Sequence, residues 1–137
     1  MKTLVVDDDF GCRFLLQELL KQMGHQVDCA ENGRDAVLMY LKAAESGEPY
    51  EFVSMDNNMP IMNGLQAVEM IRAFESEHSE KVPRITICFV SSDENCRCNC
   101  MVKYGGDTYT SFVLKPLDIL HFMKIVRSSR LNSIQAG

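Results

Sequence analysis

The stretch Thr3–Gly11, TLVVDDDFG, runs from a short apolar segment directly into three consecutive aspartates, Asp7, Asp8 and Asp9. Like charges placed side by side repel one another, and at the end of a buried strand each carboxylate also gives up part of its hydration. A divalent cation relieves this repulsion and uses the carboxylate oxygens as ligands. The stretch therefore predicts a buried strand that ends at a cation site.

Short apolar segments and amphipathic helical patterns alternate along the rest of the chain. Five segments are expected to be strands: TLVVD, HQVDCA, YEFVSMD, RITICFV and TSFVLK. Each is followed by residues with helical periodicity, which gives five strand-and-helix units. Because parallel neighbours need crossover connections, this order predicts an α/β fold, a parallel sheet with helices on both faces.

Apolar residues at helical spacing mark the buried faces of the expected helices. Four sets are clear: Cys12, Leu15, Leu16, Leu19, Leu20 and Met23; Ala36, Val37, Tyr40, Leu41 and Ala44; Ala67, Met70, Ile71 and Phe74; and Ile119, Phe122, Met123 and Val126. A poorer helical pattern covers Glu94–Tyr104. We expect Gly24 to end the first helix, Asn32 to cap the second and Pro116 to begin the last.

Length, charge and cysteine usage limit the class of protein. The 137 residues fit one domain, placed at 1–128, followed by a tail at 129–137 that we expect to fray. The net charge of −5 argues against a general nucleic-acid or anionic-membrane surface. No apolar run is long enough for membrane insertion, and six cysteines without a secretory signal are expected to be reduced. We therefore expect a cytoplasmic protein.

Polar side chains follow the expected strands at the points where they end. The members are Asp7, Asp8 and Asp9 after the first strand, Asp56, Asn57 and Asn58 after the third, Ser91 and Ser92 after the fourth, and Lys115 after the fifth. In open α/β sheets, ligands bind outside the carboxyl ends of the strands. Carboxylates, a hydroxyl and an ammonium group at one edge match a site for Mg²⁺ and a phosphoryl group, with a carboxylate as nucleophile.

Four segments together, LVVDDDFGCR, SMDNNMPIMNG, FVSSDE and FVLKP, resemble the receiver domain of two-component response regulators. The resemblance covers roughly Lys2–Arg127 and keeps the order of the family's motifs. It implies a flavodoxin-like (βα)5 fold with strand order 2-1-3-4-5. It also implies a phosphoacceptor signalling domain, in which a phosphoryl group passes from a phosphohistidine donor to Asp56 in the presence of Mg²⁺. Such a domain is not a separate enzyme but catalyses its own phosphorylation and dephosphorylation.

The resemblance also implies a role for each matching residue. Asp56 is the expected phosphoacceptor, and Met59, Pro60 and Gly64 complete its turn motif. The expected ligands of Mg²⁺ are Asp7, Asp8, Asp56 and the backbone carbonyl of Asn58. Ser91 and Lys115 are expected to contact the phosphoryl group, Ser91 and Phe112 to act as the switch, and Asn58 and Asp93 to tune dephosphorylation. Asp9 falls in a variable loop position, Arg13 matches a basic residue of the first helix, and the Lys115–Pro116 bond is usually cis in the family.

Expected partners follow from the same resemblance. The donor would be a histidine kinase or a histidine phosphotransfer protein, and output would come from the fourth helix, fifth strand and fifth helix docking on an unknown effector. We expect a stand-alone receiver with no direct nucleic-acid contact. Gly106–Phe112 is about two residues longer than usual, which affects this output surface. The connector before Pro83 is also long, as in receivers of phosphorelays and hybrid kinases.

Two other functions compete with this interpretation. A haloacid-dehalogenase-type phosphatase would use Asp7 as nucleophile and Asp9 as its partner acid, but the sequence has Gly11 where that family has Thr or Val, and no acidic pair follows Lys115. A cysteine-based metal or redox module would use Cys96, Cys98 and Cys100. Alternate residues of a helix are about 200° apart, so these thiols converge only if the segment is a loop.

Overall fold

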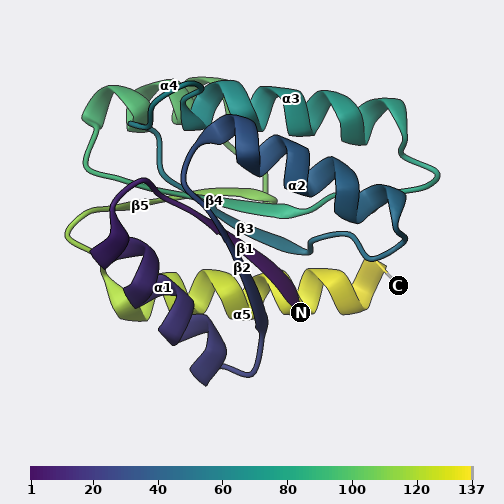
Figure 1. The fold of residues 1–137 in the computed structure, drawn as a ribbon, viewed down its shortest axis with the longest axis horizontal. Coiled ribbons are helices and arrows are strands. Elements are labelled where there is room, and N and C mark those ends of the chain that lie inside the picture. The colour runs from purple at the N-terminus through teal and green to yellow at the C-terminus, as the bar shows by residue number, and fades with distance from the viewer. Residues whose placement is uncertain (137) are drawn as a thin grey trace.

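The structure is a computed structural model that describes residues 1–136, with side chains described as far as Arg130. Strands and helices alternate along the whole chain (Figure 1). The elements are β1 (Lys2–Val6), α1 (Phe10–Gln22), β2 (Gln26–Ala30), α2 (Gly33–Glu45), β3 (Phe52–Met55), α3 (Gly64–Glu77), β4 (Thr86–Ser91), α4 (Glu94–Tyr104), β5 (Thr110–Leu114) and α5 (Ile119–Ala136).

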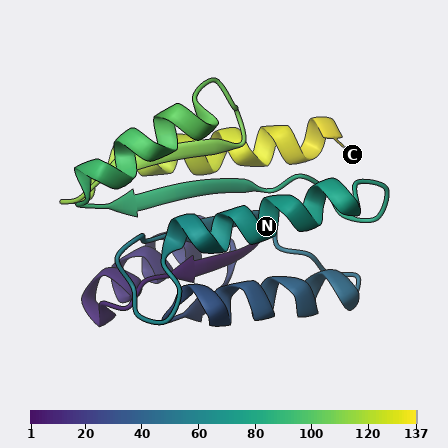
Figure 2. The same ribbon diagram turned by 90° about the horizontal axis from the view of Figure 1, so that it is seen from above.

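The five strands form one parallel sheet in the order β2-β1-β3-β4-β5, which confirms the predicted fold class. Helices α1 and α5 lie on one face of the sheet, and α2, α3 and α4 lie on the other, as Figures 1 and 2 show. After β1 the chain adds β2 on one side of this strand, and it then crosses to β3 on the other side, so the connections separate between β1 and β3. The carboxyl ends of these two strands therefore lie side by side at the switch point of the sheet.

Alternating strand residues divide the interior into two cores, because successive side chains point to opposite faces of a sheet. On the side of α2, α3 and α4, the buried strand residues include Leu4, Val6, Val53, Met55, Ile87 and Phe89. On the side of α1 and α5 they are Val5, Phe52, Cys88, Val90 and Val113. Both faces of β1, β3 and β4 are thus buried, which holds the carboxyl ends of these strands in fixed positions.

Polar residues begin the first three helices. The Asn32 side chain accepts a hydrogen bond from the Asp35 amide at 2.8 Å, which confirms the predicted cap of α2. Asn63 and Gln66 form a reciprocal capping box at α3. Asp9 caps α1 through the Cys12 amide, a role that the sequence interpretation missed when it placed Asp9 in a variable loop.

Three predicted faces differ in the structure. Leu15, Met70 and Ile119 were expected to be buried, but their exposed fractions are 44%, 48% and 43%. In α3 the buried residues are Gly64, Ala67, Val68, Ile71 and Glu75. Glu75 is accommodated there by its ion pair with Arg72 and by a hydrogen bond from the Ile85 amide. The spacing of hydrophobic residues alone could not predict that an acidic residue lies on the buried face of this helix.

The last helix begins later than predicted. The Lys115–Pro116 bond is cis, as the resemblance implied. Pro116 lies in a turn, and α5 begins at Ile119. The side chain of the preceding residue, Asp118, accepts a hydrogen bond from the His121 amide at 3.1 Å. The helix continues to Ala136. The division of the chain at residue 128 stays a prediction, and Gly137 and the side chains from 131 on lie outside the described residues.

Candidate metal and phosphoryl site

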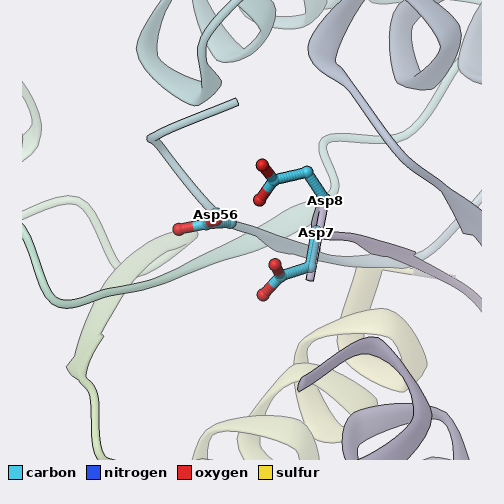
Figure 3. Close-up of side chains that lie close together, drawn as sticks. All are labelled: Asp7, Asp8 and Asp56. Atoms are coloured by element: carbon cyan, nitrogen blue, oxygen red, sulfur yellow. The ribbon is translucent and has the colours of Figure 1, made fainter. Parts of the chain in front are cut away.

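Three carboxylates meet at the carboxyl ends of β1 and β3. Asp7, Asp8 and Asp56 each offer a carboxylate oxygen, and these oxygens all lie within 4.8 Å of one another. Figure 3 shows the three side chains around a common space, with Asp7 and Asp8 coming from one segment and Asp56 from the other. Asp7 and Asp56 are buried, whereas Asp8 is exposed. The pairing of β1 with β3 produces this convergence, since the Asp56 amide donates to the Val6 carbonyl at 2.9 Å.

Lys115 brings a positive charge to the same cluster from the end of β5. Its Nζ lies 2.9 Å from Asp7 Oδ2 and 3.7 Å from Asp56 Oδ1. Burial lowers the pKa of the Lys115 ammonium, but the hydrogen bond to Asp7 and the charges of Asp56 and Asp7 outweigh burial and raise it. The ammonium therefore stays charged, and one cation faces three acids.

Burial and the negative charge of its neighbours change the acidity of Asp56. Burial and then the charge of Asp7 raise the pKa of Asp56 to about 6, although Lys115 and the Asn57 amide act in the opposite direction. Carboxylate oxygens are the ligands that hard divalent cations prefer, and Mg²⁺ accepts one or two carboxylates while keeping other positions for water or phosphate oxygens. The donor set of the cluster thus fits Mg²⁺.

Local hydrogen bonds fix the two buried acids. Asp7 Oδ1 accepts from the Asp9 amide at 2.9 Å, and the Asp7 carbonyl accepts from Arg13 Nη1 at 2.8 Å. Asp56 is packed against Gly64, whose position has no room for a side chain, because a Cβ there would lie 2.2 Å from the Asp56 carbonyl oxygen. The glycine of the turn motif is therefore needed for close approach of the backbone, not for an unusual dihedral angle.

The other predicted site residues lie around this cluster at different depths. Ser91 is fully buried at the end of β4, and its Oγ accepts a hydrogen bond from the Asp93 amide at 3.2 Å. Asn58 is exposed just after Asp56. Phe112 is half-buried beside the core on the side of α2, α3 and α4. The structure thus gathers Asp7, Asp8, Asp56 and Lys115 closely, and it places Ser91 and Phe112 on the two neighbouring strands β4 and β5.

Sequence reasoning gave no role to Asn57. This residue is buried, and its Oδ1 accepts from the Leu65 amide at 3.0 Å while its Nδ2 donates to Asp93 Oδ2 at 3.5 Å. The sequence contained only a weak indication of this role, because an asparagine next to the acceptor acid is also common in an ordinary turn.

The cysteine-based alternative does not agree with the structure. The segment is the helix α4, in which Cys96 and Cys100 are buried and Cys98 is exposed, so the three thiols do not converge. Among the described residues, the only group of three or more His, Cys, Asp or Glu side chains placed to hold a metal ion is Asp7, Asp8 and Asp56.

A parallel 2-1-3-4-5 sheet with an acidic cluster and a lysine at its switch point defines a receiver-type phosphoacceptor fold. The sequence model of the response regulator receiver domain matches residues 3–127. The chain belongs to this family, and the phosphatase alternative is not favoured.

Relatives and solved structures agree with this assignment. The chain is 42% identical over 72 residues to two-component response regulator 24 of Arabidopsis thaliana, covering 53% of the chain and 49% of that protein. It is 39% identical over 126 residues to the sensor histidine kinase GacS of Pseudomonas protegens, covering 91% of the chain and 13% of the kinase. The chain thus spans half or less of the length of these relatives.

A solved structure of the response regulator TrrA from Thermotoga maritima, in complex with Mg²⁺ and BeF, is also similar. It is 27% identical with a TM-score of 0.69, and the alignment covers 93% of the chain and 97% of that structure. Within residues 1–136, no helix is long and apolar enough to span a membrane.

Proposed function

We propose that the chain accepts a phosphoryl group on Asp56, with Mg²⁺ held by Asp7, Asp8, Asp56 and the backbone carbonyl of Asn58. The observation that carries this proposal is the meeting of the three carboxylates, within 4.8 Å, with the Lys115 ammonium that reaches both Asp7 and Asp56. The complex of TrrA with Mg²⁺ and BeF supports it, because TrrA has the same fold.

The reaction requires positioning and charge neutralisation more than covalent machinery. An Asp56 carboxylate oxygen attacks phosphorus, the new O–P bond forms, and the P–N bond of a phosphohistidine donor breaks with its electron pair returning to the imidazole. Bound Mg²⁺ supplies positive charge to the carboxylates and the phosphoryl oxygens. Lys115 Nζ is placed to donate to a phosphoryl oxygen beside Asp56, and the Ser91 hydroxyl is assigned the same function from β4.

The phosphoryl donor is proposed to be a histidine kinase or a histidine phosphotransfer protein. Phe10 and Phe14 on α1 have exposed fractions of 70% and 52%, which is unusual for large apolar side chains so close to an acidic site. An apolar cavity of about 220 Å³ is lined by other residues of α1, by β4 and by the turn after β5, with Lys115 among them. The similarity to GacS and other histidine kinases supports a donor of this class.

The domain itself would supply the groups for loss of the phosphoryl group. Asn58 is exposed beside Asp56, and the Asp93 carboxylate lies at the start of α4; they are proposed to orient the attacking water and so to limit the phosphoryl lifetime. Ser91 and Phe112 are proposed to switch together and change the surface of α4, β5 and α5 for an effector. A cytoplasmic location stays a prediction.

One experiment tests the proposal. The protein is incubated with acetyl phosphate and Mg²⁺, and intact mass and tryptic peptides are measured for wild type, Asp56→Asn and Asp7→Asn. We expect one phosphoryl group on the peptide containing Asp56, and none in Asp56→Asn. Phosphorylation of Asp7 in Asp56→Asn would contradict the assignment and favour the phosphatase alternative.

A further inference from the structure

Asn57 lies between the acceptor acid and helix α4, and all four of its polar groups are hydrogen-bonded. Its amide donates to Asp56 Oδ1 at 2.9 Å, and its carbonyl accepts from the Gly64 amide at 3.1 Å. Its Oδ1 accepts from the Leu65 amide at 3.0 Å. These three bonds hold Asn57 inside the acceptor turn. The fourth bond, from Nδ2 to Asp93 Oδ2, leaves the turn and crosses to the start of α4.

Asp93 joins the same bond to two further parts of the site. Its amide donates to Ser91 Oγ at 3.2 Å, and its Oδ1 accepts from the Asn95 amide at 2.9 Å as the cap of α4. A displacement of Ser91 therefore moves the residue that begins α4. Asn57 cannot follow such a movement, because Leu65, Gly64 and Asp56 hold it in place.

The Asn57–Asp93 bond is the longest of this set at 3.5 Å, against 2.9 to 3.2 Å for the others. Hydrogen bonds weaken as they approach this length, so this is the bond that breaks first when the two segments move apart. A phosphoryl group on Asp56 would carry about −1.5 to −2 charge at pH 7 and would repel the Asp93 carboxylate. Phosphorylation thus acts against the same bond.

We propose that Asn57 is a positioning residue that holds α4 in its resting arrangement through the Asn57–Asp93 hydrogen bond, and that phosphorylation of Asp56 releases it. This inference rests on the proposed phosphorylation of Asp56 and adds a second connection to α4 beside Ser91 and Phe112. Because coupling between two sites is reciprocal, breaking the bond also makes Asp56 a better site for a phosphoryl mimic.

The side chains allow a test in which the bond is broken and then rebuilt in reverse. In Asp93→Asn the oxygen still caps α4, since Asn and Asp are equally good caps, but the amide nitrogen then faces Asn57 Nδ2. In Asn57→Asp one carboxylate oxygen still accepts from the Leu65 amide, but the other replaces the donor Nδ2 and faces the Asp93 carboxylate, so the bond is lost. In the double variant an Asn at 93 donates to an Asp at 57, with the net charge of wild type.

The probe is beryllofluoride with saturating Mg²⁺, followed by NMR of the backbone amides of Asn95, Cys96 and Arg97. In both single variants we expect these amides, without the probe, to move partway toward their positions in the wild-type complex. We expect the apparent affinity for beryllofluoride to rise roughly twofold to tenfold in Asp93→Asn, as the loss of one hydrogen bond allows. The double variant should return both readings toward wild type. Asp118→Asn, the same change at the start of α5, is the matched control and should alter neither.

Two results would overturn the inference: wild-type amide positions and affinity in Asp93→Asn, or a double variant whose changes are the sum of the single ones. Failure of the proposed function looks different, because wild type would then bind beryllofluoride no better than Asp56→Asn. In that case the NMR signals of the α4 amides, compared without the probe among wild type, the two single variants and the double variant, still show whether the Asn57–Asp93 bond holds α4.

Discussion

Lys115 Nζ lies 2.9 Å from Asp7 Oδ2 and 3.7 Å from Asp56 Oδ1, so one ammonium group contacts one acid and approaches another that comes from a different strand. It is the positive charge that the structure places among the three carboxylates before a metal ion binds. In the proposed function the ammonium would therefore compete with Mg²⁺ for Asp7 but would assist a phosphoryl group on Asp56.

Replacing Lys115 should separate these two effects. In Lys115→Met we expect Mg²⁺ to bind more tightly, because a competing cation is lost, and beryllofluoride to bind at least about tenfold more weakly, because a charge-assisted hydrogen bond is lost. Titration of each ligand by NMR or calorimetry measures both. Lys124→Met, an exposed lysine of α5, is the control. Weaker Mg²⁺ binding in Lys115→Met would show that the lysine does not compete with the metal.

Removing the charge of Asp56 should stabilise the protein without Mg²⁺. Burial and the charge of Asp7 raise the pKa of Asp56 from 3.8 to about 6, so at neutral pH the folded protein holds a carboxylate that it destabilises. Two pKa units correspond to about 3 kcal/mol at most, so we expect Asp56→Asn to gain about 1 to 3 kcal/mol in the free energy of unfolding at pH 7.5. Urea unfolding in EDTA measures it.

The same acid sets a pH dependence. The folded state binds more protons than the unfolded state between pH 3.8 and about 6, so this group's contribution to stability falls as the pH rises through that window. The gain from Asp56→Asn should therefore be small at pH 4 and reach its full size above about pH 6. An equal gain at pH 4.5 and pH 7.5 would exclude a raised pKa of Asp56 as its cause.

Arg72 and Glu75 form a buried ion pair at the opposite end of the sheet. Arg72 donates to Glu75 at 2.7 Å and to the carbonyls of Ile85 and Tyr109, and the Ile85 amide donates to Glu75 at 2.7 Å. Removing one partner leaves the other buried and unpaired, so we expect Arg72→Met to lose about 3 to 5 kcal/mol in the free energy of unfolding.

The exposed ion pair between Glu69 and Lys103 provides the control. Glu69→Gln should cost less than about 1 kcal/mol, because exposed pairs contribute little to stability. Equal losses in Arg72→Met and Glu69→Gln, measured by chemical denaturation, would contradict the special role of the buried pair.

Gly64 should not tolerate even a methyl group. A Cβ would lie 2.2 Å from the Asp56 carbonyl oxygen, so Gly64→Ala must displace the acceptor turn. We expect a loss of more than about 2 kcal/mol of stability and weaker beryllofluoride binding. Gly11→Ala, inside α1 with its nearest atom at 3.5 Å, should be neutral or stabilise by up to about 1 kcal/mol. Thermal unfolding of the two variants compares them directly.

The sequence was sufficient for the order of strands and helices, because apolar segments and their periodicity repeat five times. It also predicted that Asp7, Asp56 and Lys115 lie at one edge of the sheet, because the carboxyl ends of parallel strands all meet at the same edge. It could not reveal the contact of Asn57 with Asp93, which depends on how two loops meet. The i,i+3 spacing of Arg72 and Glu75 on α3 is visible in the sequence, but their contacts with Ile85 and Tyr109 depend on how the helix meets two strand ends. The predicted start of α5 at Pro116 was also wrong, because the helix begins at Ile119 and Asp118 accepts a hydrogen bond from the amide of its first turn.

Helix α4 has only Cys96 and Cys100 fully buried, with Tyr104 partly buried near its end. A thiol side chain is small, so two of them remove little apolar surface from water. The other helices bury larger side chains: Leu16 and Leu20 on α1, Val37 and Tyr40 on α2, Val68 and Ile71 on α3, and Phe122 and Val126 on α5. The helix next to Asp93 is therefore the one whose displacement from the sheet requires the least free energy. The proposed release of α4 by phosphorylation of Asp56 would therefore require little rearrangement of the two cores.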